Sequence, residues 1–214
     1  MKRLYGVYGA GGCGRGILPL LRERLGSTES LVFIDDSCAG ESINGHPVWT
    51  WRRFLEERAD ERSACLCVAD SRIRERLYRN CLDEGVEVIA ARASNVVEMD
   101  DVELGQGALL SPFVTLTSNV RIGLCFHANL YSYVEHDCRI GDFVTFAPAV
   151  RCNGNVHVHD HAYIGTGAII RQGTPDEPLV IGEGAVVGMG AVVTRSVPAG
   201  ATVVGNPARP LTRR

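Results

Sequence analysis

The second half of the chain repeats an apolar residue every six positions. From Leu104 to Ile170, every sixth residue is apolar, and a second small or apolar residue recurs four positions later, from Ala108 to Ala168. A fixed short period over so long a stretch predicts a solenoid, in which each repeat stacks on its neighbours. Six residues suit one face of a triangular coil, so that 18 residues complete a turn and successive turns pair about 4.8 Å apart. Glycine often follows the aliphatic position, as in LGQG and IGDF, where a corner leaves little room for a side chain.

The repeat is interrupted once. The stretch RQGTPDEPLV, residues 171–180, is polar and contains two prolines, and the pattern resumes five positions out of phase at Ile181. We expect this stretch to protrude as a loop, because proline removes a backbone donor that the coil needs. It is either a tolerated surface insertion or a loop that closes over a ligand at a subunit boundary. The C-terminal tail, which contains VVGNPARP, is expected to cap the open end of the coil.

The first part of the chain alternates between two kinds of segment. Strands are expected at 3–9, 30–36, 63–70 and 86–91, and helices at 17–25, 49–59 and 71–85. This alternation favours a parallel sheet covered by helices. We therefore predict a small Rossmann-like α/β domain over residues 1–95, followed by a β-helix domain over residues 96–214.

Composition excludes several classes of protein. The net charge of −3 and the pI near 6.1 do not fit a nucleic-acid-binding protein. No segment approaches the ~18 apolar residues of a membrane span, and the start of the sequence lacks a secretory signal. We expect a cytoplasmic protein whose eight cysteines are reduced. Three histidines alternate at 157, 159 and 161, but the six-residue register turns all of them outward without zinc-type partners, so no metal is expected.

A glycine-rich turn follows the first expected strand. Gly9, Gly11 and Gly14 form a G-x-G-x-x-G pattern, and Gly12 lies within it. Backbone N–H groups at such a turn can hold a diphosphate, and Asp35 or Asp36, at the end of the second strand, can approach a ribose or base. A dehydrogenase would share these features, but 90 residues leave little room for a full dinucleotide-binding fold. A tight turn beside a solvated strand end is the alternative.

His136 lies in the stretch SYVEHDCRIGDF. A neutral imidazole can accept a proton from an attacking amine or hydroxyl. Gly154 follows 18 residues later, one turn along on the same corner, where its N–H can stabilise an oxyanion. Asp137 can orient the imidazole only at a corner, since adjacent residues of a strand point apart, and Glu135 is the alternative. A solvated surface histidine remains the other interpretation.

These stretches together resemble a known family. The hexapeptides, GAGGCGRG, FIDD and VEHDCRIG are similar to those of the bacterial nucleotide-amino-sugar N-acetyltransferases and their sialic-acid O-acetyltransferase relatives. The resemblance implies a left-handed β-helix of about five turns and a homotrimer with active sites between subunits. It also implies acetyl transfer from acetyl-CoA to the amine of an NDP-4-amino-4,6-dideoxysugar in bacterial glycan biosynthesis, with UDP preferred and GDP or dTDP open.

The resemblance assigns roles to individual residues. His136 becomes the general base and the Gly154 amide the oxyanion donor, while Asp137 stands where relatives often carry a glutamate one methylene longer. Asn129 is expected to contact the sugar. The nucleotide-sugar contacts are expected at Gly9, Gly11, Gly12, Asp35 and Asp36, and those of the coenzyme at Gly165, Gly184, Ala185 and Arg209. Two other functions remain open: O-acetylation of sialic acid or another sugar hydroxyl, and a non-catalytic scaffold or sugar-nucleotide sensor.

Overall fold

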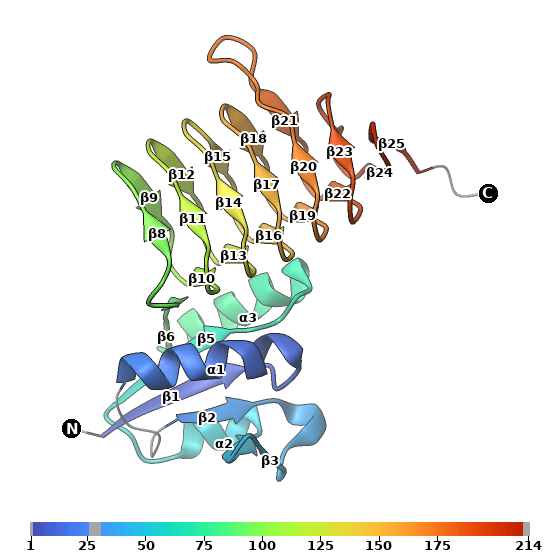
Figure 1. The fold of residues 1–214 in the computed structure, drawn as a ribbon. Coiled ribbons are helices and arrows are strands. Elements are labelled where there is room, and N and C mark those ends of the chain that lie inside the picture. The colour runs from blue at the N-terminus through green and yellow to red at the C-terminus, as the bar shows by residue number, and fades with distance from the viewer. Residues whose placement is uncertain (1, 26–30, 212–214) are drawn as a thin grey trace. The chain divides into compact units, whose positions relative to one another are not determined.

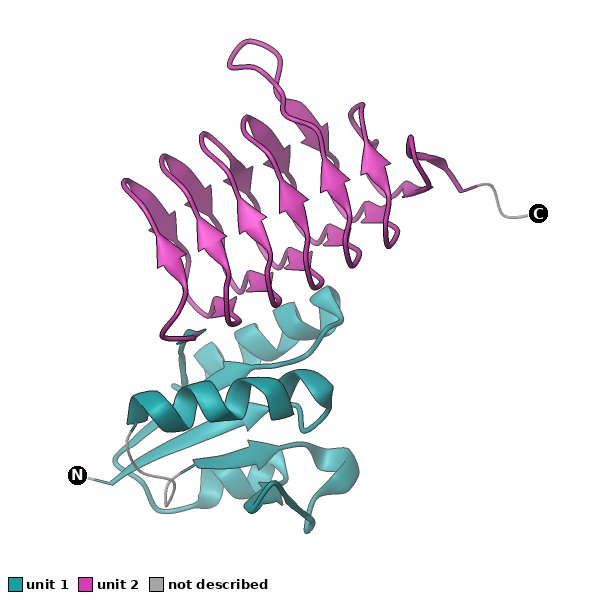
Figure 2. Ribbon diagram, viewed as in Figure 1, with its two compact units in different colours: residues 1–91 teal, residues 92–214 magenta. Residues whose placement is uncertain are grey.

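The computed structural model describes residues 2–25 and 31–211. The chain divides into two compact units, residues 1–91 and residues 92–214 (Figure 2). Ser30, where the second expected strand begins, lies outside the described residues.

The first unit is built on a mainly parallel sheet (Figure 1). β1 lies in its middle and pairs in parallel with β2 and β5, which confirms the parallel α/β sheet expected from the sequence. The strands, in sheet order, are β3 (Ser42–Ile43), β4 (His46–Trp49), β2 (Leu31–Ile34), β1 (Arg3–Tyr8), β5 (Glu61–Leu66) and β6 (Glu87–Val88). The helices are α1 (Gly12–Leu25), η1 (Asp36–Cys38), α2 (Trp51–Glu56) and α3 (Ser71–Asp83).

The helix expected over 49–59 is shorter than predicted. Trp49 belongs to strand β4, and α2 begins only after Thr50, whose Oγ1 accepts a hydrogen bond from the Arg53 N–H at 3.0 Å. The hairpin of β3 and β4 was missed altogether. Its turn is Asn44–Gly45, with φ of 50° and 80°, and this dipeptide is itself a strong hairpin signal.

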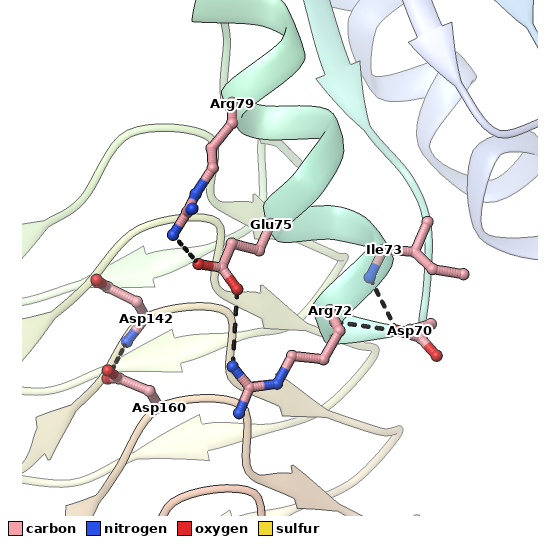
Figure 3. Close-up of polar contacts among 7 residues, drawn as sticks. All are labelled: Asp70, Arg72, Ile73, Glu75, Arg79, Asp142 and Asp160. Atoms are coloured by element: carbon pink, nitrogen blue, oxygen red, sulfur yellow. Dashed lines mark hydrogen bonds and ion pairs between the residues drawn. The ribbon is translucent and has the colours of Figure 1, made fainter.

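Helix α3 has a well-formed N-terminus. The carboxylate of Asp70 accepts hydrogen bonds from the N–H groups of Arg72 and Ile73, both at 2.9 Å (Figure 3). Such a cap satisfies backbone donors that have no partner within the helix. One turn further on, Glu75 pairs with Arg79 along the same helix, as the i,i+4 spacing allows.

The chain of the second unit passes through three sheets in turn, and these sheets are parallel except for the last pair of strands. We call this arrangement the coil. Sheet I holds β7 (Ala91–Arg92), β10 (Leu109–Leu110), β13 (His127–Ala128), β16 (Thr145–Phe146), β19 (Tyr163–Ile164), β22 (Val186–Val187), β24 (Thr202–Val204) and β25 (Arg209–Pro210). Sheet II holds β8 (Val97–Glu98), β11 (Thr115–Leu116), β14 (Tyr133–Val134), β17 (Arg151–Cys152), β20 (Ile169–Ile170) and β23 (Val192–Val193). Sheet III holds β9 (Val102–Leu104), β12 (Val120–Ile122), β15 (Arg139–Ile140), β18 (Val156–Val158) and β21 (Leu179–Ile181).

The register of the coil follows the sequence period. Paired residues are 18 apart, as in Val134↔Cys152. Every expected inward position of both apolar series is buried from Ala108 to Ile170, which confirms the register. Beyond that point Val156 pairs with Leu179, 23 residues on, so the interruption adds five residues to one turn. At the C-terminal end, β25 runs back antiparallel to β24.

No helix among residues 2–25 and 31–211 has the length and apolar character to cross a membrane.

Candidate active site

His136 and Asp137 lie at the corner of the coil between β14 and β15, where sheet II meets sheet III. Asp137 adopts a φ of 59°, in the left-handed region, and the chain therefore turns between the two residues. The turn brings Oδ2 of Asp137 to 2.8 Å from Nδ1 of His136. An ionised carboxylate can only accept, so Nδ1 carries the proton and Nε2 is left as the acceptor for a substrate. The corner that the Asp137 contact requires is present, and Asp137 rather than Glu135 is the partner.

The shorter side chain at position 137 has a structural reason. The same corner position is held by Asp101, Asn119 and Asn155 in neighbouring turns, with φ of 55°, 60° and 54°. Asn and Asp tolerate the left-handed region better than other non-glycine residues. An aspartate therefore fits this backbone and still reaches the imidazole. The pair is open to solvent, with side-chain exposures of 55 % for His136 and 49 % for Asp137.

Gly154 lies directly against the imidazole of His136. A Cβ added at Gly154 would come within 2.5 Å of Cε1 and 2.6 Å of Nε2 of His136, so any side chain would displace the ring. Within residues 2–25 and 31–211, no group accepts a hydrogen bond from the Gly154 N–H. The corner thus combines a proton acceptor with a backbone donor one turn away, as the sequence period predicts.

The loop over residues 171–180 leaves the coil at this same corner. The N–H of Gly173 donates to the carbonyl of Gly154 at 3.0 Å, and the N–H of Leu179 donates to the carbonyl of Asn155 at 3.1 Å. Figure 1 shows the loop projecting between β20 and β21. The structure therefore locates the base of the loop directly beyond the His136–Gly154 pair.

Asn129 occupies a different corner of the coil. It lies in the turn between β13 and β14, where sheet I meets sheet II, and it is exposed. Its Oδ1 accepts a hydrogen bond from the N–H of Leu130 at 2.8 Å. Within one chain, the structure does not bring Asn129 together with His136.

The residues expected to bind the coenzyme are spread over the coil. Gly165 lies on the corner between sheets I and II, Gly184 and Ala185 on the corner between sheets III and I, and Arg209 in β25. The N–H groups of Gly165 and Gly184 already donate to Val187 and Asp160. The structure does not gather these residues on one corner. A coenzyme bound at these residues would contact their carbonyl oxygens or side chains.

The glycine-rich turn and Asp35 do come together in the first unit. Gly14 packs so closely on the carbonyl of Gly9 that a Cβ would lie 1.9 Å from that oxygen, whereas nothing lies within 4 Å of a Cβ at Gly11 or Gly12. Asp35 accepts a hydrogen bond from the Ala10 N–H at 3.0 Å and so fastens the turn. Burial alone would raise the pKa of Asp35, but hydrogen bonds from Ser37 and Ala10 lower it.

Asp36 contacts the start of α2 instead of the glycine-rich turn. Its Oδ1 accepts a hydrogen bond from the Trp51 N–H at 3.1 Å. The acidic pair is therefore divided, with Asp35 at the turn and Asp36 at a helix.

A groove lies on the outer face of sheet III, and the outward histidines His157 and His159 are among its lining residues. Its volume is about 650 Å³, and its charged or polar lining residues are Glu103, Arg121, Arg139, His157, His159 and Asp160. Arg139 comes three residues after His136 and is outward in the register, a signal that was available in the sequence. Among the described residues, no three His, Cys, Asp or Glu side chains are grouped so as to hold a metal ion.

The six-residue repeat and the parallel strands that it forms are typical of the hexapeptide-repeat acyltransferases. No protein-family model matches the chain. The chain belongs to the nucleotide-sugar N-acetyltransferase family, because it is 50 % identical over 214 residues to the GDP-perosamine N-acetyltransferase of Escherichia coli O157:H7, a match that covers 98 % of this chain and 97 % of that protein.

Two solved structures agree with this membership. WeeI from Acinetobacter baumannii AYE is 55 % identical, with a TM-score of 0.97 over 98 % of this chain and 100 % of that one. The acetyltransferase domain of PglB from Neisseria gonorrhoeae FA1090, in complex with acetyl coenzyme A, is 29 % identical with a TM-score of 0.86, and covers 99 % of this chain and 100 % of that one.

Proposed function

We propose that this enzyme transfers an acetyl group from acetyl-CoA to the amine of a GDP-linked 4-amino-4,6-dideoxysugar, with GDP-perosamine as the first candidate. The observation that carries the proposal is the position of the His136 imidazole. It is hydrogen-bonded to Asp137 and lies against the backbone of Gly154, which has no side chain. The E. coli relative is named for GDP-perosamine, and the PglB domain was solved with acetyl coenzyme A. The name of the E. coli relative favours GDP over the UDP that we first expected.

The chemistry follows from the geometry of the corner. Nε2 of His136 accepts a proton from the sugar amine as its nitrogen attacks the thioester carbonyl. Asp137 stabilises the imidazolium, and the Gly154 N–H donates to the oxyanion that forms. Collapse of the tetrahedral intermediate forms the amide and breaks the carbon–sulfur bond. The proton held by His136 then passes to the departing CoA thiolate.

We also infer how the sites are assembled. The coil is a left-handed β-helix of about five turns, and three copies form a trimer with active sites between subunits. The placement of Asn129 supports this arrangement, because a site that uses Asn129 and His136 together requires two corners of the coil. The Rossmann-like first unit holds the nucleotide at Gly9, Gly11 and Gly12, with Asp35 nearby, and the enzyme acts in the cytoplasm.

The test is turnover of acetyl-CoA, followed as free thiol, with GDP-perosamine, UDP- and dTDP-linked amino-sugars and free sialic acid. We expect GDP-perosamine to give the highest kcat/KM. We expect His136→Ala to lower kcat/KM by about 10²–10⁴, the usual contribution of general acid–base catalysis. Ser118→Ala is the matched control, because Ser118 lies one turn earlier at the same corner position.

Two results would contradict the proposal. Near-wild-type kcat/KM in His136→Ala would show that His136 is not the general base. Faster turnover of sialic acid than of any nucleotide sugar would favour the O-acetyltransferase alternative.

A further inference from the structure

We propose that Cys138 is a positioning residue, whose buried thiol sets the orientation of the peptide group that carries the Gly154 N–H. This inference rests on the proposed function, in which that N–H stabilises the oxyanion. Cys138 follows Asp137 directly in the sequence and is fully buried inside the coil. It does not touch the space beside His136 where the substrates would react.

The thiol acts on the carbonyl of Asn153. Sγ of Cys138 donates a hydrogen bond to this oxygen at 3.2 Å. The C=O of Asn153 and the N–H of Gly154 belong to one planar trans peptide group, in which the two bonds point in opposite directions. Because the thiol holds the carbonyl toward the interior of the coil, the Gly154 N–H is turned outward. The His136 ring lies against Gly154 on this same outer side of the coil.

The thiol is itself held in place. Its sulfur accepts a hydrogen bond from the N–H of Val156 at 3.4 Å. Cys138 therefore links Asn153, before Gly154, and Val156, after it, to the turn that carries His136. The side chain of Asn153 is held as well, because the hydroxyl of Tyr133 donates to its Oδ1 at 2.9 Å.

The coil does not need a thiol at this inward position for packing. The residues that occupy the same register in other turns are all aliphatic: Val102, Val120, Val156 and Leu179. At this register, among the described residues, a donor replaces the aliphatic side chain only at Cys138. The thiol of Cys152, in the next turn, also reaches the Asn153 carbonyl, but at the longer distance of 3.9 Å. This departure from the repeat coincides with the one peptide whose orientation the proposed chemistry requires.

Cys138→Val is the decisive variant, because it restores the residue type of the neighbouring turns while removing the donor. We expect it to fold with a Tm close to that of the wild type. We expect kcat to fall about tenfold, less than the 10²–10³ that follows loss of an oxyanion donor, with unchanged KM for both substrates. Cys138→Ser, which keeps a donor, should recover most of the lost kcat. Val120→Ala, at the same register one turn earlier, controls for packing.

Crystal structures of the variants give a readout that does not depend on turnover. We expect the Asn153–Gly154 peptide to rotate in Cys138→Val and to keep its orientation in Cys138→Ser. An unmoved peptide in Cys138→Val would overturn the inference, whatever the activity. Full kcat in Cys138→Val, or an equal loss in Cys138→Ser, would overturn it too. Failure of the wild type to acetylate any nucleotide sugar would refute the proposed function instead, and the peptide orientation would still decide the role of Cys138.

Discussion

The contact between Asp137 and His136 offers a sharp test of the proposed chemistry. Asp137→Asn removes the negative charge but preserves the size of the side chain. It also preserves the backbone, because Asn119 and Asn155 adopt the same left-handed φ at the same corner position. The variant should therefore fold normally and lose only the stabilisation of the imidazolium and the control of its tautomer.

The expected loss is moderate because the pair is exposed. The Nδ1···Oδ2 distance of 2.8 Å is short, but about half of each side chain is open to solvent. Exposed ion pairs contribute up to about 1 kcal/mol, and hydrogen bonds to charged groups roughly 1.5–3 kcal/mol. A loss of about 1–2 kcal/mol in the transition state corresponds to a fall of roughly 5–30-fold in kcat/KM. A buried aspartate of a serine-protease triad costs roughly 10⁴ in kcat when it is replaced in the same way.

The assay is thiol release from acetyl-CoA at saturating nucleotide sugar, compared across three proteins. Asp101→Asn is the matched control, since Asp101 occupies the same corner position two turns earlier with a φ of 55°. We expect the control to keep the wild-type kcat/KM. A loss below twofold in Asp137→Asn would show that Asp137 does not assist the base. A loss near 10⁴ would show that the pair is buried during turnover.

Three further changes test other parts of the structure. Gly154→Ala should lower kcat/KM by about 10²-fold with little change in Tm, because its Cβ pushes aside the solvent-exposed end of His136; normal kinetics would contradict the contact. Excision of residues 174–178 restores the 18-residue spacing between Val156 and the rest of the coil, so Tm should hold while KM for acetyl-CoA rises; unchanged kinetics would make the loop a tolerated insertion. His157→Gln should weaken the fall in Tm between pH 7.5 and 5.5. Burial, then Arg139 and His159, lower the pKa of His157, so the unfolded chain takes up its proton first and the free energy of unfolding falls as the pH drops through about 6.5. An identical fall in wild type and variant would contradict this assignment.

The sequence predicts the coil well because its apolar period follows the positions that are buried. Two positions in each hexapeptide identify the inward side chains, and the shift at Ile181 reveals the five added residues. It also places His136 and Gly154 side by side, because residues 18 apart must be neighbours. The contact with Asp137 could not be settled from the sequence, since it depends on a left-handed φ at a single residue.

The coenzyme-binding residues, the hairpin and the Cys138 contact depend on geometry that the six-residue period does not determine. Gly165, Gly184 and Arg209 follow from resemblance alone, and the structure separates them among two corners and the last strand. The β3–β4 hairpin was missed because its strands are short, although Asn44–Gly45 announces the turn. The contact of Cys138 with Asn153 was hidden because an inward cysteine reads as one more apolar residue in the series.

The regular register repeats the same backbone positions at a fixed spacing along the axis of the coil. The positions that hold His136 and Asp137 in one turn hold Ser118 and Asn119 in the turn before, on the same backbone geometry. In the proposed function, one turn of this repeating backbone carries the catalytic residues, and the neighbouring turns have the same backbone geometry at that corner. Moving the proposed site by one turn requires Ser118→His, Asn119→Asp, Val120→Cys and His136→Gly, with the rest of the coil unchanged. Such substitutions would change the distance between the proposed acetyl-transfer site and either end of the coil in steps of about 4.8 Å.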